Sequence, residues 1–370
     1  MLITPTSPEN LSDALAKRTP FLLILPSAAI RQARILRGIP EHLDARGGDM
    51  TCIKCQHKNV RRFGVYGKKR IQRYRCNGCG ATFSEDRPKP LGNHTIDFEK
   101  AIQVISLLVE GVSIRAASRL TGMHKRTILS LLVFAGGKCQ TVLDGTVRKL
   151  HPRYVQLDEL WTFVHTKERN LRSGDPDEWG DAYTWIALDS ETKLIISHLV
   201  GKRDAESANE FLADYSSRVV GLHQLTSDGY RPYLEAVETY FGADIHFAQL
   251  VKVYGRPKEA GPDWYGPAEV IDTLPTPIVG EPDEEHISTS HAERSNLNFR
   301  MHLRRFTRLV NGFSKKLDNL KAAVALYVAW YNFCRVHQTL RVTPAMEAGI
   351  SDHVWEIEEL LQSSARSRAA

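Results

Sequence analysis

The chain has 370 residues and a formal net charge of +6, with 42% hydrophobic and 25% charged side chains. These ordinary globular proportions exclude a collagen-like, a wholly disordered and a coiled-coil protein. No apolar run approaches the roughly 18–20 residues of a membrane span, and the run at residues 21–26 is shorter than the ~7–15-residue core of a secretory signal, so we expect a cytoplasmic protein.

Charge is distributed by segment. Residues 50–150 carry 19 basic and 6 acidic side chains, whereas residues 151–290 carry 12 basic and 25 acidic ones. A basic segment can bind a polyanion by releasing its condensed counterions, and an acidic segment can hold divalent cations. Charge by itself leaves open the alternative that both runs are solvated faces without a partner.

The first 49 residues show no sustained hydrophobic period, although residues 10–17 and 28–37 could each form a short helix. We therefore predict a weakly structured extension over residues 1–49. Met50 directly precedes the first cysteine pair and is our candidate for the natural start. A chain beginning there should still fold.

Two Cys-x-x-Cys pairs, Cys52/Cys55 and Cys76/Cys79, are separated by 20 residues. Each pair can occupy two corners of a tetrahedral zinc site. Zinc bound in this way can contribute ~10–16 kcal/mol to a segment too small to fold by itself. Two redox dithiols, or unrelated buried cysteines, fit this paired spacing less well. We predict a zinc ribbon over residues 50–92, with the four thiolates as ligands of a structural Zn²⁺.

Basic and aromatic residues are interleaved between the two cysteine pairs. This composition suits contacts with phosphates and stacking on bases. The residues that we expect to bind DNA in this segment are Lys68, Lys69, Arg70 and Arg73.

Residues 93–150 predict a helix-turn-helix module. Apolar residues recur at three- and four-residue steps from Asp97 until Gly111, and Ser113 is a candidate N-cap for a second helix over 114–120. A turn at 121–123 then leads into a third helix over about 124–134.

The third of these helices is a candidate recognition helix. Its amino-terminal end would meet base edges in the major groove, and the residues exposed there are Lys125, Arg126, Thr127 and Ser130. An ordinary three-helix bundle is the alternative. We interpret Gly136-Gly137 and the stretch to Pro152 as a link to the next domain.

Residues 151–349 predict an α/β domain. Their hydrophobic patterns give three strands, a helix, a strand, a helix and a further strand, an order that indicates a mixed sheet. The predicted ranges are 154–164, 182–189, 194–200, 204–220, 222–227, 230–241 and 245–251.

Three carboxylates fall at corresponding places in this domain: Asp158 on its first strand, Asp228 after its fourth, and Glu293 at the start of the following helix. Two divalent ions ~3.5–4 Å apart can be held by such a set and can activate a water or a 3′-hydroxyl for attack at phosphorus. Oxygen ligands suit Mg²⁺ or Mn²⁺. Taken singly, each carboxylate could instead be a turn former or surface residue. Glu159 alternates to the other strand face and is less favoured.

The order of zinc ribbon, helix-turn-helix and three-carboxylate domain resembles bacterial insertion-sequence transposases of the insertion-sequence-one type. The resemblance implies a ribonuclease-H-like fold with Asp158, Asp228 and Glu293 as metal ligands. It also implies a nucleoid-associated enzyme that cuts and joins double-stranded DNA at the ends of a mobile element, as a homodimer or larger assembly. The stretches that carry it are residues 74–84, 157–161, 184–189, 202–204, 226–230 and 291–296.

Glu293 lies 65 positions after Asp228, a longer spacing than in many such enzymes, and residues 254–290 contain six prolines. We expect an inserted loop of low regularity at about 254–290, which makes its carboxylates alternatives for the third ligand: Glu281, Glu284 and Glu285. Glu293 is preferred because it begins a basic amphipathic helix that could hold DNA phosphates. The arginines of that helix are Arg294, Arg300, Arg304, Arg305 and Arg308.

The carboxy-terminal part predicts a strong helix over 315–333 and a tail over 350–370, frayed from 363. Cys139 and Cys334 are expected to be buried apolar residues, and His337 is given no catalytic role. Two other functions stay open: a DNA-binding transcriptional regulator whose α/β domain is catalytically silent, and a nuclease or resolvase of the same fold.

Overall fold

The structure is a computed structural model that describes residues 51–67, 70–84, 90–255, 269–307 and 311–362. The chain divides into two compact units, residues 1–87 and 88–370. The extension over 1–49, the helices expected within it and Met50 lie outside the described residues.

The first unit is a three-stranded antiparallel sheet in the order β1-β2-β3. Its strands are β1 (Val60–Tyr66), β2 (Ile71–Cys76) and β3 (Thr82–Ser84). Among the residues of this unit that the structure describes, the buried apolar cluster consists of Cys52, Cys76 and Phe83, with the ring of Tyr74 stacked on Phe83 at 5.9 Å. A core of this size is too small to stabilise the unit without a further cross-link.

The second unit begins with three helices, α2 (Phe98–Val109), α3 (Ile114–Thr121) and α4 (Lys125–Thr146). The Asp97 carboxylate caps α2 by accepting from the Lys100 N–H at 3.2 Å, and the Ser113 hydroxyl caps α3 through the Ala116 N–H at 3.1 Å. The predicted starts of the first two helices are thereby confirmed.

The link expected from Gly136 onward is wrong, because α4 continues through both glycines to Thr146. The reason lies in its contact with α8 (Leu317–Phe333): a Cβ at Gly136 would lie 2.4 Å from the Ala322 carbonyl oxygen. Gly136 therefore permits close helix packing and does not end the helix. Judged by length and hydropathy, α4 is the one helix in the described part of the chain that could span a bilayer, yet its buried face packs against α8.

Gly136 and Gly137 provide a matched test of this packing. Gly136→Ala should destabilise the second unit by about 1–3 kcal/mol, because the new methyl group overpacks the α4–α8 contact. Gly137→Ala, with no atom within 4 Å of its new Cβ, should stabilise the unit by about 0.5–1 kcal/mol through helix propensity. Urea unfolding of both variants measures the difference. Equal effects would contradict the proposed close approach.

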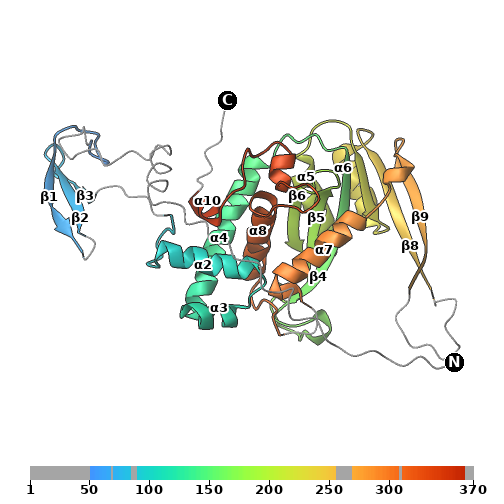
Figure 1. Cartoon of the computed structure of the whole chain (residues 1–370), viewed down its shortest axis with the longest axis horizontal. Helices are drawn as coiled ribbons and strands as arrows, with labels where there is room; N and C mark the ends of the chain where they lie inside the picture. The colour runs from blue at the N-terminus through green and yellow to red at the C-terminus, as the bar shows by residue number, and fades with distance from the viewer. Residues whose placement is uncertain (1–50, 68–69, 85–89, 256–268, 308–310, 363–370) are drawn as a thin grey trace, which may run out of the picture. The chain divides into compact units, whose positions relative to one another are not determined.

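The α/β part of this unit contains a six-stranded sheet in the order β6-β5-β4-β7-β8-β9. Figure 1 shows β5 and β6 toward one side of this sheet and β8 and β9 toward the other. Strand β7 pairs in parallel with β4 and β8, whereas the other pairs are antiparallel, so the predicted mixed sheet is confirmed. The strands are β4 (Tyr154–Val164), β5 (Gly180–Asp189), β6 (Ile195–Gly201), β7 (Gln224–Asp228), β8 (His246–Gly255) and β9 (Glu269–Val279).

Helices cover both faces of the sheet. Glu159 of β4 accepts from Tyr233 of α6 (Pro232–Phe241), whereas its neighbour Asp158 accepts from Asn296 of α7 (Ser290–His302). Successive side chains of a strand point to opposite faces, so α6 and α7 lie on opposite sides. Helix α5 (Ala205–Ser216) packs with α6, and α8 contacts β6.

The predicted irregular loop at 254–290 is wrong over residues 269–279, which form the edge strand β9 paired with β8. Pro275 and Pro277 lie within this strand. A proline cannot donate a ladder hydrogen bond, so strand prolines are confined to edges. The composition that suggested irregularity is therefore compatible with this particular strand.

The tail expected over 350–370 is wrong in its first part. Helix α10 (Ile357–Gln362) follows the short helix α9 (Pro344–Glu347), and Leu360 and Leu361 are fully buried in the main hydrophobic cluster. Residues 363–370 lie outside the described residues. The same cluster contains the apolar faces of α2, α3 and α4, so the boundary expected at residue 150 does not separate two cores.

Candidate active site and metal centre

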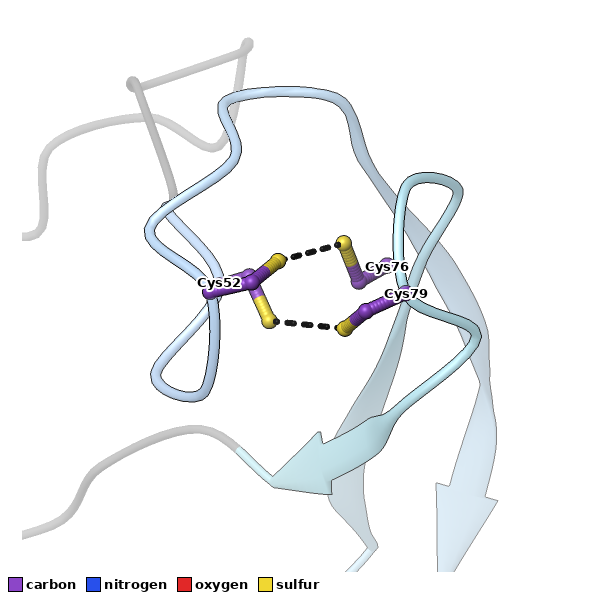
Figure 2. A group of neighbouring side chains, drawn as sticks. Cys52, Cys76 and Cys79 are labelled. Atoms are coloured by element: carbon purple, nitrogen blue, oxygen red, sulfur yellow. Dashed lines mark hydrogen bonds between the residues drawn. The ribbon is translucent and has the colours of Figure 1, made fainter.

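The four cysteine thiols of the first unit converge on one point (Figure 2). Their sulfur atoms all lie within 4.8 Å of one another. The Sγ–Sγ distance is 3.7 Å for Cys52 and Cys79 and 3.6 Å for Cys55 and Cys76. Within the described ranges, no other group of three or more metal-ligating side chains is as compact. This arrangement is compatible with structural zinc, as the spacing predicted.

Backbone groups and neighbouring thiols shape the charge of this cluster. The Lys54 N–H donates to Cys52 Sγ at 3.4 Å, and the Gly78 N–H donates to Cys76 Sγ at 3.3 Å. Although desolvation opposes ionisation, the backbone N–H groups of Cys55 and Lys54 and the adjacent thiols lower the pKa of Cys52 to about 6. The pKa of Cys55 is raised to about 12 because the neighbouring thiols outweigh the His57 N–H. Four adjacent thiolates therefore require a cation.

The register of the parallel strands β4 and β7 places Asp158 and Asp228 on the same face of the sheet. Gln156 pairs with Thr226, and each aspartate lies two residues further along its own strand. Two residues is the side-chain period of a strand. Asp228 is also the last residue of β7, so its carboxylate lies at the strand end, where the Tyr230 N–H donates to it at 3.0 Å.

Helix α7 contributes Glu293 and Asn296, which lie three residues apart and therefore on one helix face. The Asn296 amide donates to Asp158 Oδ2 at 2.7 Å, while its own carbonyl oxygen is buried without a hydrogen-bond partner in the described structure. Glu293 accepts from the Thr289 hydroxyl at 2.7 Å and pairs with the Lys252 ammonium of β8.

A fourth carboxylate, Glu159, is connected to this group through Arg203. The guanidinium contacts Glu159 Oε2 at 3.1 Å and Asp228 Oδ2 at 3.3 Å, and it stacks on the Tyr230 ring at 4.1 Å. The Glu159 side chain is only 3% exposed and also accepts from the Tyr233 hydroxyl. Glu159 thus lies on the other strand face, as predicted, but is coupled to the site.

The electrostatics of the site show an excess of negative charge. Burial, followed by the charges of Asp228 and Glu293, raises the pKa of Asp158 to about 7. Burial and the charge of Asp228 also raise the pKa of Glu159 to about 7 despite Arg203. Partial burial opposes ionisation of Glu293, but the hydrogen bonds from Lys252 and Thr289 lower its pKa. The carboxylates are close enough to repel one another even beside two basic side chains.

The alternative third carboxylates, Glu281, Glu284 and Glu285, lie between β9 and α7. Glu293 shares α7 with Asn296, which donates to Asp158, and the charge of Glu293 contributes to the raised pKa of Asp158. The geometry therefore favours Glu293 among the four candidates.

The residues expected to bind DNA occupy varied surroundings. Arg70 is exposed and Arg73 is half-buried, donating to the Thr82 hydroxyl at 3.0 Å. Lys68 and Lys69 lie outside the described residues. At the start of α4, Lys125 and Arg126 are exposed and Thr127 is half-buried, whereas Ser130 is hydrogen-bonded to His94 at 2.9 Å.

The basic helix expected after Glu293 is shorter than predicted. It contains Arg294, which is exposed, and Arg300, which is half-buried. Arg304 and Arg305 follow the helix end in a 3-10 turn that buries Phe306, and Arg308 lies outside the described residues. Burial of Phe306 against Phe299 explains why the chain leaves the helical path there.

Sequence reasoning assigned no role to Arg203, Lys252 or Asn296. Arg203 and Asn296 lie within the stretches that carry the family resemblance, and Asn296 also stands at helical spacing from Glu293. These two features of the sequence could have indicated a role for Arg203 and Asn296. No feature of the sequence indicated a role for Lys252, because its contact with Glu293 spans 41 residues and depends on the fold.

Arg203→Ala should destabilise the second unit by about 1–2 kcal/mol at pH 8, where Glu159 is ionised. The loss is smaller than the roughly 3–5 kcal/mol of a fully buried pair, because the guanidinium is 37% exposed. The double variant with Glu159→Gln should recover most of that loss. Urea unfolding of the two single variants and the double variant, without divalent metal, measures the coupling. Strictly additive effects would show that Arg203 does not stabilise the buried Glu159 charge.

No family model matches the chain, and a search of curated proteins finds no match. The chemistry of the two clusters therefore carries the functional argument.

Proposed function

We propose that the protein is a D-D-E transposase that binds the terminal inverted repeats of an insertion sequence and catalyses metal-dependent DNA cleavage and strand transfer. The observation that carries this proposal is the group of carboxylates from β4, the end of β7 and α7. Burial, together with the charges of Asp228 and Glu293, raises the pKa of Asp158. We further propose that the α/β part has a ribonuclease-H-like fold.

The donor set fits hard divalent cations. Asp158, Asp228 and Glu293 offer carboxylate oxygens, and the buried Asn296 carbonyl oxygen beside Asp158 lacks a hydrogen-bond partner within the described structure. Oxygen ligands of this kind suit Mg²⁺ or Mn²⁺. Two such ions would stabilise the attacking and the leaving oxygen at phosphorus.

The chain's own residues prepare this chemistry. The Asn296 amide orients the Asp158 carboxylate, and Arg203 restrains Asp228 from its other side. Lys252 beside Glu293 provides a positive charge that a DNA phosphate could meet on approaching the site. These contacts hold the carboxylates in place before a substrate arrives, which lowers the reorganisation required for reaction.

Recognition of DNA is assigned to the two amino-terminal modules. Structural zinc at the four cysteines would hold the basic ribbon, and the exposed Lys125 and Arg126 stand at the amino-terminal end of α4, where a recognition helix meets base edges. We propose double-stranded DNA as the partner and a homodimer or larger assembly as the working form, because two element ends must be held together.

The test is a cleavage and joining assay with the full chain, Mg²⁺ or Mn²⁺, and DNA carrying the inverted repeats that flank the coding region. Cut ends that become joined to target DNA are expected. Cut ends without joined products would indicate a nuclease or resolvase. Tight DNA binding without any nick would indicate a regulator with a silent α/β domain.

A further inference from the structure

An aromatic surface continues from Glu159 along β4. Trp161 and Phe163 follow it at two-residue steps, so they share its strand face. Both residues are half-buried, and they lie beyond Gln156, the last residue of β4 that pairs with β7. The Trp161 ring therefore lies about 7 Å along the strand from Glu159, which contacts Arg203. The Phe163 ring lies further along the same strand.

An open cavity of about 510 Å³ lies over this surface. It is lined by Trp161, Lys167, Glu168, Arg169 and Asp181. This volume falls within the roughly 300–1,000 Å³ of sites that take small organic ligands.

The acidic wall of the cavity is fixed by internal hydrogen bonds. Glu168 Oε2 accepts from the Asp181 N–H at 2.9 Å, and Asp181 Oδ1 accepts in return from the Glu168 N–H at 3.1 Å. Lys202 pairs with the same Glu168 oxygen at 3.2 Å. A Cβ at Gly180, where φ is +96°, would lie 2.1 Å from Glu168 Oε2. These contacts hold both carboxylates against the loop, and the cationic residues of the lining are Lys167 and Arg169.

The cationic and aromatic groups lie together. The Lys167 ammonium is 5.7 Å from the Trp161 ring centroid and 6.0 Å from that of Phe163, and the Phe313 ring packs on Phe163 at 4.7 Å. Arg169 is exposed and forms no ion pair within the described part of the chain. A planar aromatic ligand could displace the Lys167 ammonium from the face of the Trp161 indole. Lys167 and Arg169 would then be near enough to contact anionic groups of the same ligand.

We propose that this cavity binds an unpaired nucleobase of the DNA strand that passes the carboxylate site, stacked on Trp161, with Lys167 and Arg169 contacting adjacent phosphates. The inference rests on the proposed function, because it assumes that DNA occupies the neighbouring site. An unpaired base is required, since the faces of a base inside a duplex are covered by its neighbours. Stacking on an aromatic side chain tolerates any base, so the cavity selects for strand separation and not for sequence.

The test uses the full chain and an oligothymidylate that carries one 2-aminopurine, whose fluorescence is quenched by stacking. Trp161→Ala should weaken binding of the oligonucleotide about 5- to 100-fold. It should also abolish the quenching of 2-aminopurine fluorescence that binding to the unmodified chain causes. Trp161→Phe should retain most of the affinity and most of the quenching, because phenylalanine still offers an aromatic ring for stacking. Arg169→Glu should weaken binding and flatten its dependence on salt concentration. Tyr240→Ala, which removes an aromatic residue of α6 that is 38% exposed, is the matched control and should bind like the unmodified chain.

A blunt duplex measured in parallel separates the possible failures. If Trp161→Ala keeps its native circular dichroism, binds the oligonucleotide as tightly as the unmodified chain and quenches it equally, the inference is overturned. If the unmodified chain binds and cuts duplex DNA but ignores the oligonucleotide, only the base-binding cavity is wrong. If it binds neither DNA, the proposed function fails and the cavity inference fails with it.

Discussion

Asp228→Asn is expected to reduce Mg²⁺- or Mn²⁺-dependent DNA cleavage by at least about 10³-fold, equivalent to roughly 4 kcal/mol of transition-state stabilisation. The asparagine keeps the size of the side chain and its carbonyl oxygen, so it can still accept from the Tyr230 N–H at the end of β7. It removes the negative charge that contributes to the raised pKa of Asp158. Affinity for divalent cations should therefore fall together with the cleavage rate.

DNA binding separates a catalytic defect from a folding defect in this variant. Lys125 and Arg126 lie at the start of α4, whereas Asp228 ends β7, so the affinity for DNA should stay within about threefold of the original. Asp244→Asn, an exposed aspartate after α6, is the matched control and should cleave normally. Retained cleavage by Asp228→Asn would remove Asp228 from the active site. Equal losses in both variants would point to a nonspecific effect of charge.

Cys76→Ser is expected to eliminate the zinc of the first unit and to unfold its three-stranded sheet. A thiolate is replaced by a hydroxyl, which is a poor zinc ligand, and the ~10–16 kcal/mol that zinc can supply greatly exceeds what the three-residue core can provide. The second unit has its own extensive core and should unfold at an unchanged temperature. Zinc content by mass spectrometry, together with calorimetry of the full chain, measures both effects.

Cys139→Ala provides the contrasting result. This cysteine is buried in α4, and burial raises the pKa of its thiol to about 12, so it is a neutral apolar group far from ionisation at neutral pH. Its removal should leave the zinc content unchanged and destabilise the second unit by about 1 kcal/mol. Unchanged zinc in Cys76→Ser would refute the ribbon. Zinc loss in Cys139→Ala would show that the metal is not held by the four clustered thiols.

Local patterns predicted much of the fold, and the exceptions have a common cause. The strand at 154–164 was predicted with its exact bounds, and Asp97 and Ser113 cap helices as expected. Each of these features depends on residues close together in sequence. By contrast, the glycine pair in α4 and the prolines of β9 were interpreted as breaks because their surroundings were unknown. Packing against α8 in the first case, and an edge position in the second, reversed what the residue types suggested.

The same distinction between local sequence features and long-range contacts applies to the candidate site. The four cysteines and the carboxylates Asp158, Asp228 and Glu293 could be predicted from the linear sequence, because ligand spacing and positions on predicted strands and helices are visible there. The contacts of Arg203 with Glu159 and Asp228, and of Lys252 with Glu293, become visible only in the folded chain. These pairs are far apart in the chain. Their energies depend on burial and distance, which arise only when β4, β7, β8 and α7 are assembled around one sheet.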